Sequence, residues 1–327
     1  MVMRRVTRPA LILLAFGAML LPGAAQAQTT APPPAAAPAR TFGAYVDPWN
    51  LAPWRQAGIG PQYVARFEAF SRGATVHAFI REAEAQGLGS VLVSWEPWRP
   101  VPPELGVAAQ FASQAGYRNV DIAAGAQDDY ILAFARDLAT YPGTVYLRYA
   151  HEMNGTWYPW SRDPIAYRRA WRHVVRLFGS AGAHNVRFVW SVNPSLFLSA
   201  KDWLRSVRVY WPGRRYVDVL GSTMINFGGK KAYPVKRFEP RLSRLHKLYR
   251  RPLMLTEVKT ARAGRVRWLR DLRAMLRRRS WIRSVTWFQS QSRAAVQLDD
   301  VGAGSWDLTR DAAAARVVRG IIRDGRR

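Results

Sequence analysis

The segment HEMNG, residues 151–155, holds the side chains best suited to chemistry in this 327-residue chain. It follows an apolar run that has the alternation of a strand, and a second glutamate, Glu257, ends another such run. Two carboxyl groups that face each other can break a glycosidic bond, because one protonates the leaving oxygen while the other attacks the anomeric carbon. We therefore predict Glu152 and Glu257 as a catalytic pair.

Aromatic residues come directly after the first glutamate, at Trp157, Tyr158 and Trp160. Flat rings of this kind can lie against the apolar faces of sugar rings. They also provide the apolar setting that raises the pKa of a carboxylic acid, which favours Glu152 as the acid. The alternative is that the three rings belong to the core, where aromatic residues are often buried. Their place beside Asn-Gly and Pro is unlike core patterning and favours a sugar site.

Polar and aromatic residues also lie at the ends of other apolar runs, where a parallel barrel would carry its active site. A structural domain would not need carboxylates and tryptophans converging on one rim. The predicted substrate-binding residues are His151, Asn154, Trp157, Trp160, Trp95, Asn193, Asn226 and Trp287.

Other kinds of site find less support. His151-Glu152 begins like the zinc motif H-E-x-x-H, but Gly155 stands where the second histidine would be. The chain has no cysteine, which excludes disulfides and thiol chemistry. No metal or cofactor is expected. His77 suits either a structural role or the site, and Asp299-Asp300 indicates a turn.

Eight short apolar runs alternate with amphipathic stretches, as in a (β/α)8 TIM barrel of the α/β class. No G-x-G-x-x-G follows the first run, which argues against a dinucleotide fold. The predicted strands are 41–46, 74–79, 90–95, 144–150, 186–191, 217–223, 253–257 and 284–289, within a domain that covers 41–327.

The first residues indicate export. Residues 1–27 combine a basic start, a short apolar run and a small-x-small cleavage site, the pattern of a signal peptide. The apolar run is too short for a membrane span. Residues 28–40 are rich in Pro and Ala and predict an extended linker. We expect a secreted or periplasmic monomer that has no membrane span after cleavage.

The formal net charge is +27, and arginines concentrate in 262–284. Such a surface suits an anionic glycan or the anionic cell envelope as a partner. For the 262–284 segment we favour the alternative of a solvated basic helix, because long arginine runs on one helix usually face water. Nucleic acid is not expected, because the chain is predicted to be exported and the segment has little aromatic interleaving.

The run YLRYAHEMNGTWYPW resembles the acid/base segment of glycoside hydrolase family 26, the β-mannanases and related endo-glycanases. Shorter segments that resemble the family occur in the same order: FGAYV, VSWEPW, AAGAQDDYILAFA, FVWSVNP, YVDVLG, PLMLTEV and VTWFQ. The resemblance implies a retaining (β/α)8 barrel that acts on a polysaccharide. It also implies Glu152 as acid/base, Glu257 as nucleophile, and a sugar site shaped by His151 and Trp157.

Two positions depart from the family pattern. Ile225 stands where the family has a tyrosine that holds the nucleophile, and Lys259 stands where a small residue is usual. Two hypotheses follow from these departures. The chain is either a retaining endo-β-glycosidase acting on mannan, a related β-glycan or an exopolysaccharide, or a catalytically impaired glycan-binding barrel.

Overall fold

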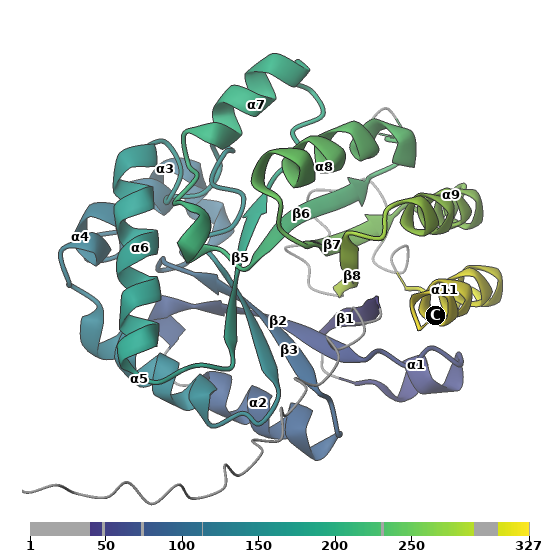
Figure 1. The fold of residues 1–327 in the computed structure, drawn as a ribbon, viewed down its shortest axis with the longest axis horizontal. Coiled ribbons are helices and arrows are strands. Elements are labelled where there is room, and N and C mark those ends of the chain that lie inside the picture. The colour runs from purple at the N-terminus through teal and green to yellow at the C-terminus, as the bar shows by residue number, and fades with distance from the viewer. Residues whose placement is uncertain are drawn as a thin grey trace, which may run out of the picture. The chain divides into compact units, whose positions relative to one another are not determined.

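Eight parallel strands close into a barrel in which each strand bonds to the next and β8 bonds to β1 (Figure 1). The computed structural model describes residues 40–47, 50–72, 75–112, 114–229, 232–290 and 307–326. The strands are β1 (Thr41–Asp47), β2 (Tyr63–Ala69), β3 (Ser90–Glu96), β4 (Thr144–Tyr149), β5 (Val186–Val192), β6 (Val219–Asn226), β7 (Leu253–Thr260) and β8 (Ile282–Ser290).

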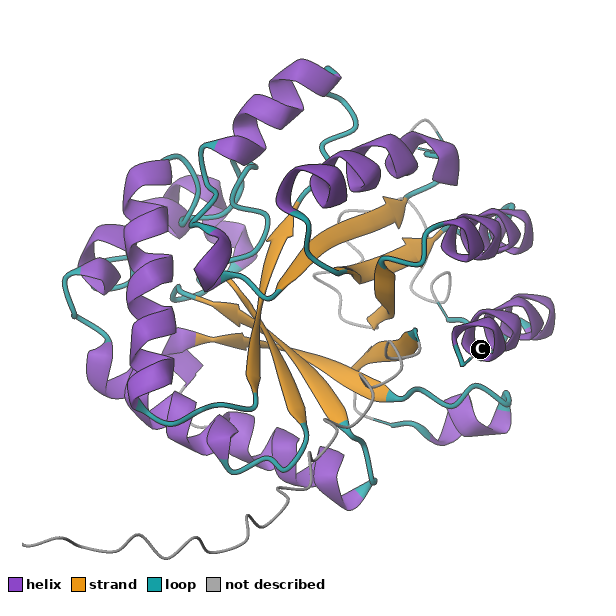
Figure 2. Ribbon diagram, viewed as in Figure 1, coloured by secondary structure: helices purple, strands orange, loops and turns teal. Residues whose placement is uncertain are grey.

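Helices surround the strands, as Figure 2 shows. The α-helices are α1 (Ala52–Gln56), α2 (Thr75–Ala85), α3 (Gly106–Ala112), α4 (Asn119–Ala123), α5 (Asp128–Ala139), α6 (Pro164–Ser180), α7 (Ala200–Arg208), α8 (Val235–Tyr249), α9 (Arg265–Arg278) and α11 (Ala312–Gly325). Short 3-10 turns are η1 (Phe70–Arg72), η2 (Pro103–Leu105) and η3 (Arg214–Tyr216). The predicted (β/α)8 barrel is confirmed.

The prediction of the second strand was wrong. Residues 75–85 form helix α2, because Val76, Phe79, Ile80 and Ala83 recur at helical spacing and are all buried. The strand lies earlier, at Tyr63–Ala69. Two charged residues interrupt its apolar run, Arg66 and the buried Glu68, which form an ion pair at 2.9 Å. The strand therefore lacks the continuous apolar pattern expected of a buried parallel strand.

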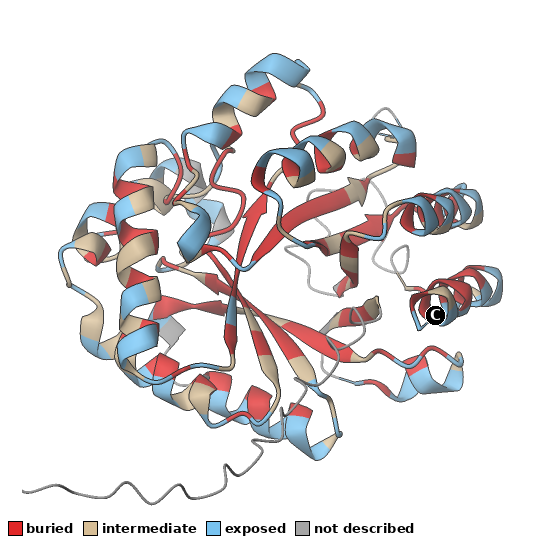
Figure 3. Cartoon of the chain, in the orientation of Figure 1, coloured by how far each residue is buried: buried red, intermediate tan, exposed pale blue. Residues whose placement is uncertain are grey.

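Two apolar cores hold the barrel together. One fills its interior and includes Tyr63, Leu92, Val189 and Met254. The larger core lies between the strands and the helices, whose buried residues gather on the faces turned to the barrel (Figure 3). Gly43 is required at the inner core, because a Cβ there would approach the Tyr63 ring to 2.3 Å.

Local signals place the helix that follows the HEMNG segment. Asp163 accepts hydrogen bonds from the backbone N–H groups of Ile165 and Ala166, and Pro164 opens α6. The cap therefore fixes where the 151–162 loop ends. No described helix combines the length and apolarity that a bilayer crossing needs. The predicted signal peptide lies outside the described residues, as does all of the linker except Arg40.

Candidate functional site

The nucleophile candidate forms an ion pair inside the barrel. Arg148 on β4 is fully buried, and its Nη1 lies 2.6 Å from Oε1 of Glu257 on β7. The same nitrogen donates a hydrogen bond to Oγ of Ser94, at 3.2 Å. The guanidinium also lies 5.9 Å from the centre of the Phe67 ring. These contacts fix the guanidinium, which in turn orients the Glu257 carboxylate.

An irregularity in β7 directs Glu257 toward the barrel mouth. The register against β6 runs from Ser222 opposite Leu255 to Thr223 opposite Glu257, so that Thr256 is the extra residue of a bulge. Thr256 hydrogen-bonds Ser191 across the interior, at 3.0 Å. Bulges occur beside active sites because they re-aim side chains. Here the bulge turns two consecutive residues of β7 inward.

Glu152 reaches the same place from the end of β4. Its backbone has φ of 53°, and Ala150 has φ of 43°, in the left-handed region that residues other than glycine rarely adopt. The Glu152 N–H donates to the carbonyl of Ser191 at 2.8 Å. Its side chain accepts a hydrogen bond from Thr223 Oγ1. Because Thr223 lies opposite Glu257 in the β6–β7 register, this contact brings the two carboxyl groups together.

Burial raises the pKa of Glu152, and the negative charge of Glu257 raises it further. The charge of Arg148 and hydrogen bonds from Thr223 and Asn193 act in the opposite direction. The result is a raised pKa, so that Glu152 keeps its proton to higher pH than an ordinary glutamate. This is the property that a general acid needs near neutrality.

Removal of the Thr223 hydroxyl tests this balance. Because its hydrogen bond lowers the pKa of Glu152, we expect Thr223→Val to raise that pKa and move the alkaline limb of the kcat/KM profile to higher pH. Thr260→Val is the control, since Thr260 bonds Asn226 and, among the described residues, forms no hydrogen bond with either carboxyl group. A profile that is identical in wild type and Thr223→Val would contradict the assignment of Glu152 as the acid.

His151 is held between aromatic rings. Its Nε2 lies 3.0 Å from Tyr158 Oη, and its backbone carbonyl accepts a 2.7 Å hydrogen bond from Trp160 Nε1. Tyr158 and Trp160 stack with centroids 4.3 Å apart. Burial, with the charge of Arg148, holds the pKa of His151 well below its usual range. The imidazole is therefore neutral at physiological pH.

Two of the predicted aromatic residues differ in burial: Trp157 is partly exposed and Trp160 lies in the core. Trp157 is 38% exposed and covers Gly155, whose missing side chain leaves room for the indole. Trp160 is 1% exposed and packs against Tyr158 and Trp98. Trp157 is therefore placed to meet a ligand, whereas Trp160 supports the histidine.

This division predicts different effects for two similar substitutions. Trp157→Ala should raise KM roughly fivefold, for a lost ring contact of about 1 kcal/mol, and leave the free energy of unfolding nearly unchanged. Trp160→Ala should lower that free energy by about 3–5 kcal/mol. Denaturant unfolding and steady-state kinetics measure both quantities. Equal losses of stability in the two variants would contradict the division.

Two predicted substrate-binding residues lie elsewhere. Trp95 is fully buried in the outer core, where it stacks on Phe134 with centroids 4.4 Å apart. Trp287 is also fully buried in that core, while its neighbour Phe288 stacks on Tyr45 inside the barrel. Strand alternation explains both placements, because adjacent residues point to opposite sides. Their burial removes Trp95 and Trp287 from the candidate site.

The three predicted asparagines connect loops. Asn154 exchanges two 2.9 Å hydrogen bonds with the backbone of Asn193. The Asn193 side chain bonds Glu152 and the N–H of Ser195. Asn226 donates to Thr260 and accepts from the N–H of Tyr233. The Asn193 side chain thus reaches a candidate catalytic residue directly.

Other rim residues also differ from the sequence interpretation. His77 lies on α2, half exposed, 3.8 Å from Asp137, and is not part of the site. Gln289 bonds Asp307 and the N–H of Leu308, which joins β8 to the segment before α11. The predicted turn at Asp299-Asp300 lies outside the described residues. Ile225 lies two residues beyond Thr223 on β6 and, by alternation, on the same inward side.

Sequence reasoning missed Arg148, Thr223 and Phe67. Arg148 interrupts the apolar run YLRYA, and a charge inside a buried strand is a signal that could have revealed it. Thr223 is an ordinary strand residue by type. Phe67 was overlooked with β2 as a whole, although its ring lies edge-on to His151 with centroids 5.7 Å apart.

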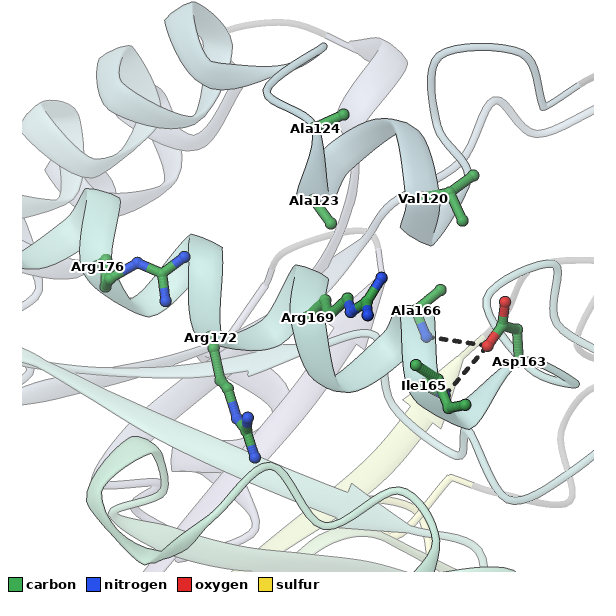
Figure 4. Close-up of a pocket in the computed structure, with 9 residues that line it drawn as sticks. All are labelled: Val120, Ala123, Ala124, Asp163, Ile165, Ala166, Arg169, Arg172 and Arg176. Carbon is green, nitrogen blue, oxygen red and sulfur yellow. Dashed lines mark hydrogen bonds between the residues drawn. The ribbon is translucent and has the colours of Figure 1, made fainter.

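A pocket on the outer surface is separate from this site. It lies between α4 and α6 and has a volume of about 490 Å³ (Figure 4). Arg169, Arg172 and Arg176 of α6 line this pocket, and Asp163 lies at the N-terminal end of the same helix. The Arg172 side chain donates a 2.7 Å hydrogen bond to the carbonyl of Pro212. None of the proposed catalytic residues lines this pocket.

Known proteins resemble this chain in sequence and in fold. Among curated proteins, Endoglucanase H of Acetivibrio thermocellus is 28% identical over 248 residues, which cover 68% of this chain and 25% of that protein. The chain thus spans about a quarter of the length of that relative.

Solved structures share the fold. A family 26 β-mannanase of Bacteroides ovatus superposes with a TM-score of 0.63 at 18% identity, covering 88% of this chain and 89% of that one. An endo-β-1,4-mannanase domain of Bacillus sp. JAMB-750 gives a TM-score of 0.58 at 15% identity, covering 88% and 86%.

The match to a family settles the classification. The sequence model of glycosyl hydrolase family 26 matches residues 127–295, more than half of the chain. The matched range contains the HEMNG segment, Arg148, Thr223 and Glu257. The chain therefore belongs to glycosyl hydrolase family 26.

Proposed function

We propose that this chain is a retaining endo-β-glycosidase that hydrolyses mannan or a related β-glycan. The observation that carries the proposal is the pairing of two unlike carboxyl groups. Glu152 has a raised pKa, while Glu257 is held by Arg148 at 2.6 Å. One group is thus suited to donate a proton and the other to attack as a carboxylate.

The reaction proceeds in two displacements. In the first, Glu257 attacks the anomeric carbon and forms a glycosyl ester, while Glu152 gives its proton to the departing glycosidic oxygen. In the second, the Glu152 carboxylate takes a proton from water, and the hydroxide formed attacks the anomeric carbon. The Glu257–sugar bond breaks, and both carboxyl groups return to their first state.

The presence of Ile225 in place of the tyrosine does not mean that activity is lost. The role given to a tyrosine at that position is to hold the nucleophile, and here Arg148 contacts Glu257 directly. Thr223, two residues earlier on the same strand, bonds Glu152. These contacts favour an active enzyme over an impaired glycan-binding barrel. We propose mannan as substrate on family grounds, because mannanases are among the structures that share the fold.

Release of reducing ends from a panel of mannan, glucomannan, xylan and mixed-linkage β-glucan tests the function. We expect wild type to act on at least one of these polymers and Glu257→Ala on none. The anomeric configuration is retained if the sugar first released is the β-anomer, which NMR can observe before mutarotation. Binding to a polymer without hydrolysis would favour the impaired barrel.

We also propose that the protein is exported after cleavage behind Ala27, on the signal-peptide pattern of residues 1–27. N-terminal sequencing of the protein recovered from the periplasm or medium tests this step. An N-terminus that still carries residues 1–27 would contradict it.

A further inference from the structure

Helices α7 and α8 border a groove of about 690 Å³ on the outside of the barrel. Six of its described lining residues are cationic and none is acidic. The cations are Lys201, Arg205, Arg208, Arg237, Arg241 and Arg244.

The cations form two parallel stripes. On each helix they occupy positions i, i+4 and i+7, which is one face of an α-helix. Each stripe extends about 10 Å along its helix, since the rise is about 1.5 Å per residue. Like charges at this spacing repel one another. An anionic strand lying in the groove would relieve that repulsion on both sides.

Acidic residues of the same helices are engaged elsewhere. Asp202 on α7 accepts a hydrogen bond from Ser199. Glu239 on α8 forms ion pairs with Arg278 and Arg279 at 3.1 and 2.8 Å. Within the part of the chain that the structure describes, the groove cations Lys201, Arg205, Arg208 and Arg244 form no ion pair.

The arginine-rich segment around α9 is different. Arg273 and Arg277 both pair with Asp324, at 2.7 and 3.0 Å. Arg265 is buried and donates to the carbonyl of Asp307. These arginines join helices to one another. The α7/α8 groove is by contrast a surface whose positive charges are uncompensated, and the sequence did not single it out.

The groove is connected to the mouth of the barrel. Arg241 donates to the carbonyls of Leu198 and Ser199, and Arg237 donates to that of Leu196. Between these anchored residues Phe197 is 71% exposed. The same loop begins at Asn193, whose side chain bonds Glu152. An exposed ring thus lies on the loop that leads from the catalytic pair to the cationic groove.

We propose that the α7/α8 groove binds the carboxylate groups of an acidic polysaccharide whose chain continues over Phe197 into the barrel mouth. Guanidinium groups bind carboxylates with paired hydrogen bonds, and an exposed aromatic ring suits the apolar face of a sugar. The inference rests on the proposed function and takes the related β-glycan named there to be an acidic one, because the polymer held in the groove is the glycan that the catalytic pair cleaves.

The shape of the site favours a polymer strand over an anionic membrane. The two stripes line opposite walls of a groove, and a strand between them can contact both. A flat bilayer would reach mainly the rims. Arg241, which lines the groove, is buried, and its guanidinium lies 4.7 Å from the Trp203 ring centre.

The test compares two variants of equal charge in a Glu257→Ala background, which leaves the probe polymer intact. The groove variant carries Arg205→Gln, Arg208→Gln and Arg244→Gln. The control variant carries Arg136→Gln, Arg270→Gln and Arg316→Gln, which are exposed and lie on α5, α9 and α11. Binding to polygalacturonate is measured at about 20 mM and about 150 mM salt, where screening lengths differ more than twofold.

We expect the groove variant to bind polygalacturonate at least tenfold more weakly than the parent at low salt, and the control less than threefold. Binding by the parent should weaken as salt rises, whereas binding to neutral galactomannan should not. Equal losses in both variants, or no binding at low salt, would overturn the proposal. So would a loss confined to phosphatidylglycerol vesicles, which would assign the groove to a membrane.

Hydrolysis separates this inference from the proposed function. With Glu257 restored, wild type and the control variant should release reducing ends at the same rate from a neutral substrate. If no glycan is cleaved although polygalacturonate binding depends on the groove, the glycosidase proposal fails and the groove remains. If a neutral glycan is cleaved but the groove variant binds polygalacturonate normally, the groove proposal fails alone.

Discussion

Glu257→Ala is expected to lower kcat by about five orders of magnitude, as removal of a catalytic nucleophile does in other enzymes. The covalent intermediate cannot form without the carboxylate. Glu152→Ala should lower kcat strongly for substrates with poor leaving groups and only modestly for aryl glycosides with good ones, because a good leaving group needs little protonation.

Azide distinguishes the two roles by stereochemistry. In Glu257→Ala, azide takes the place of the nucleophile and attacks once, with inversion, to give an α-glycosyl azide. In Glu152→Ala, azide attacks the glycosyl ester on Glu257 and gives a β-glycosyl azide. NMR of the product reports the configuration. The reverse outcome would exchange the roles assigned to the two glutamates.

Arg148→Met is expected to have the next largest effect, on stability and catalysis together. Arg148 is fully buried and Glu257 largely so, and removal of one partner from a buried ion pair costs about 3–5 kcal/mol. The kcat should fall because Glu257 loses the group that orients it. Since the charge of Arg148 lowers the pKa of Glu152, its removal should raise that pKa and move the alkaline limb upward.

Arg66→Met is the matched control for this experiment. Arg66 also lies on a strand and pairs with a buried glutamate, Glu68, at 2.9 Å, but its guanidinium lies near the Phe79 ring of the outer helix α2. We expect a loss of stability with kcat and the pH profile unchanged. Urea unfolding and pH-dependent kinetics provide both readouts. If Arg148→Met is destabilised but keeps wild-type kcat and pH dependence, Arg148 supports the fold without positioning the nucleophile.

The sequence by itself determined the fold class and the position of the candidate carboxyl groups along the chain. Alternating apolar runs and amphipathic stretches require buried parallel strands with outer helices. Because the carboxyl ends of the strands meet at one rim, Glu152 and Glu257 could be assigned there without a structure. The prediction of the second strand failed because Arg66 and Glu68 form an ion pair within it. A pattern of hydrophobic residues alone does not reveal such a pair.

Only the tertiary structure decided which side chains face the mouth. Residue type does not distinguish Trp157 from Trp95 or Trp287, because strand alternation and loop path determine whether an indole meets solvent or the outer core. The contact of Arg148 with Glu257 depends on two strands 109 positions apart along the chain and on the bulge at Thr256. The raised pKa of Glu152 likewise exists only once folding removes it from water beside a second carboxylate.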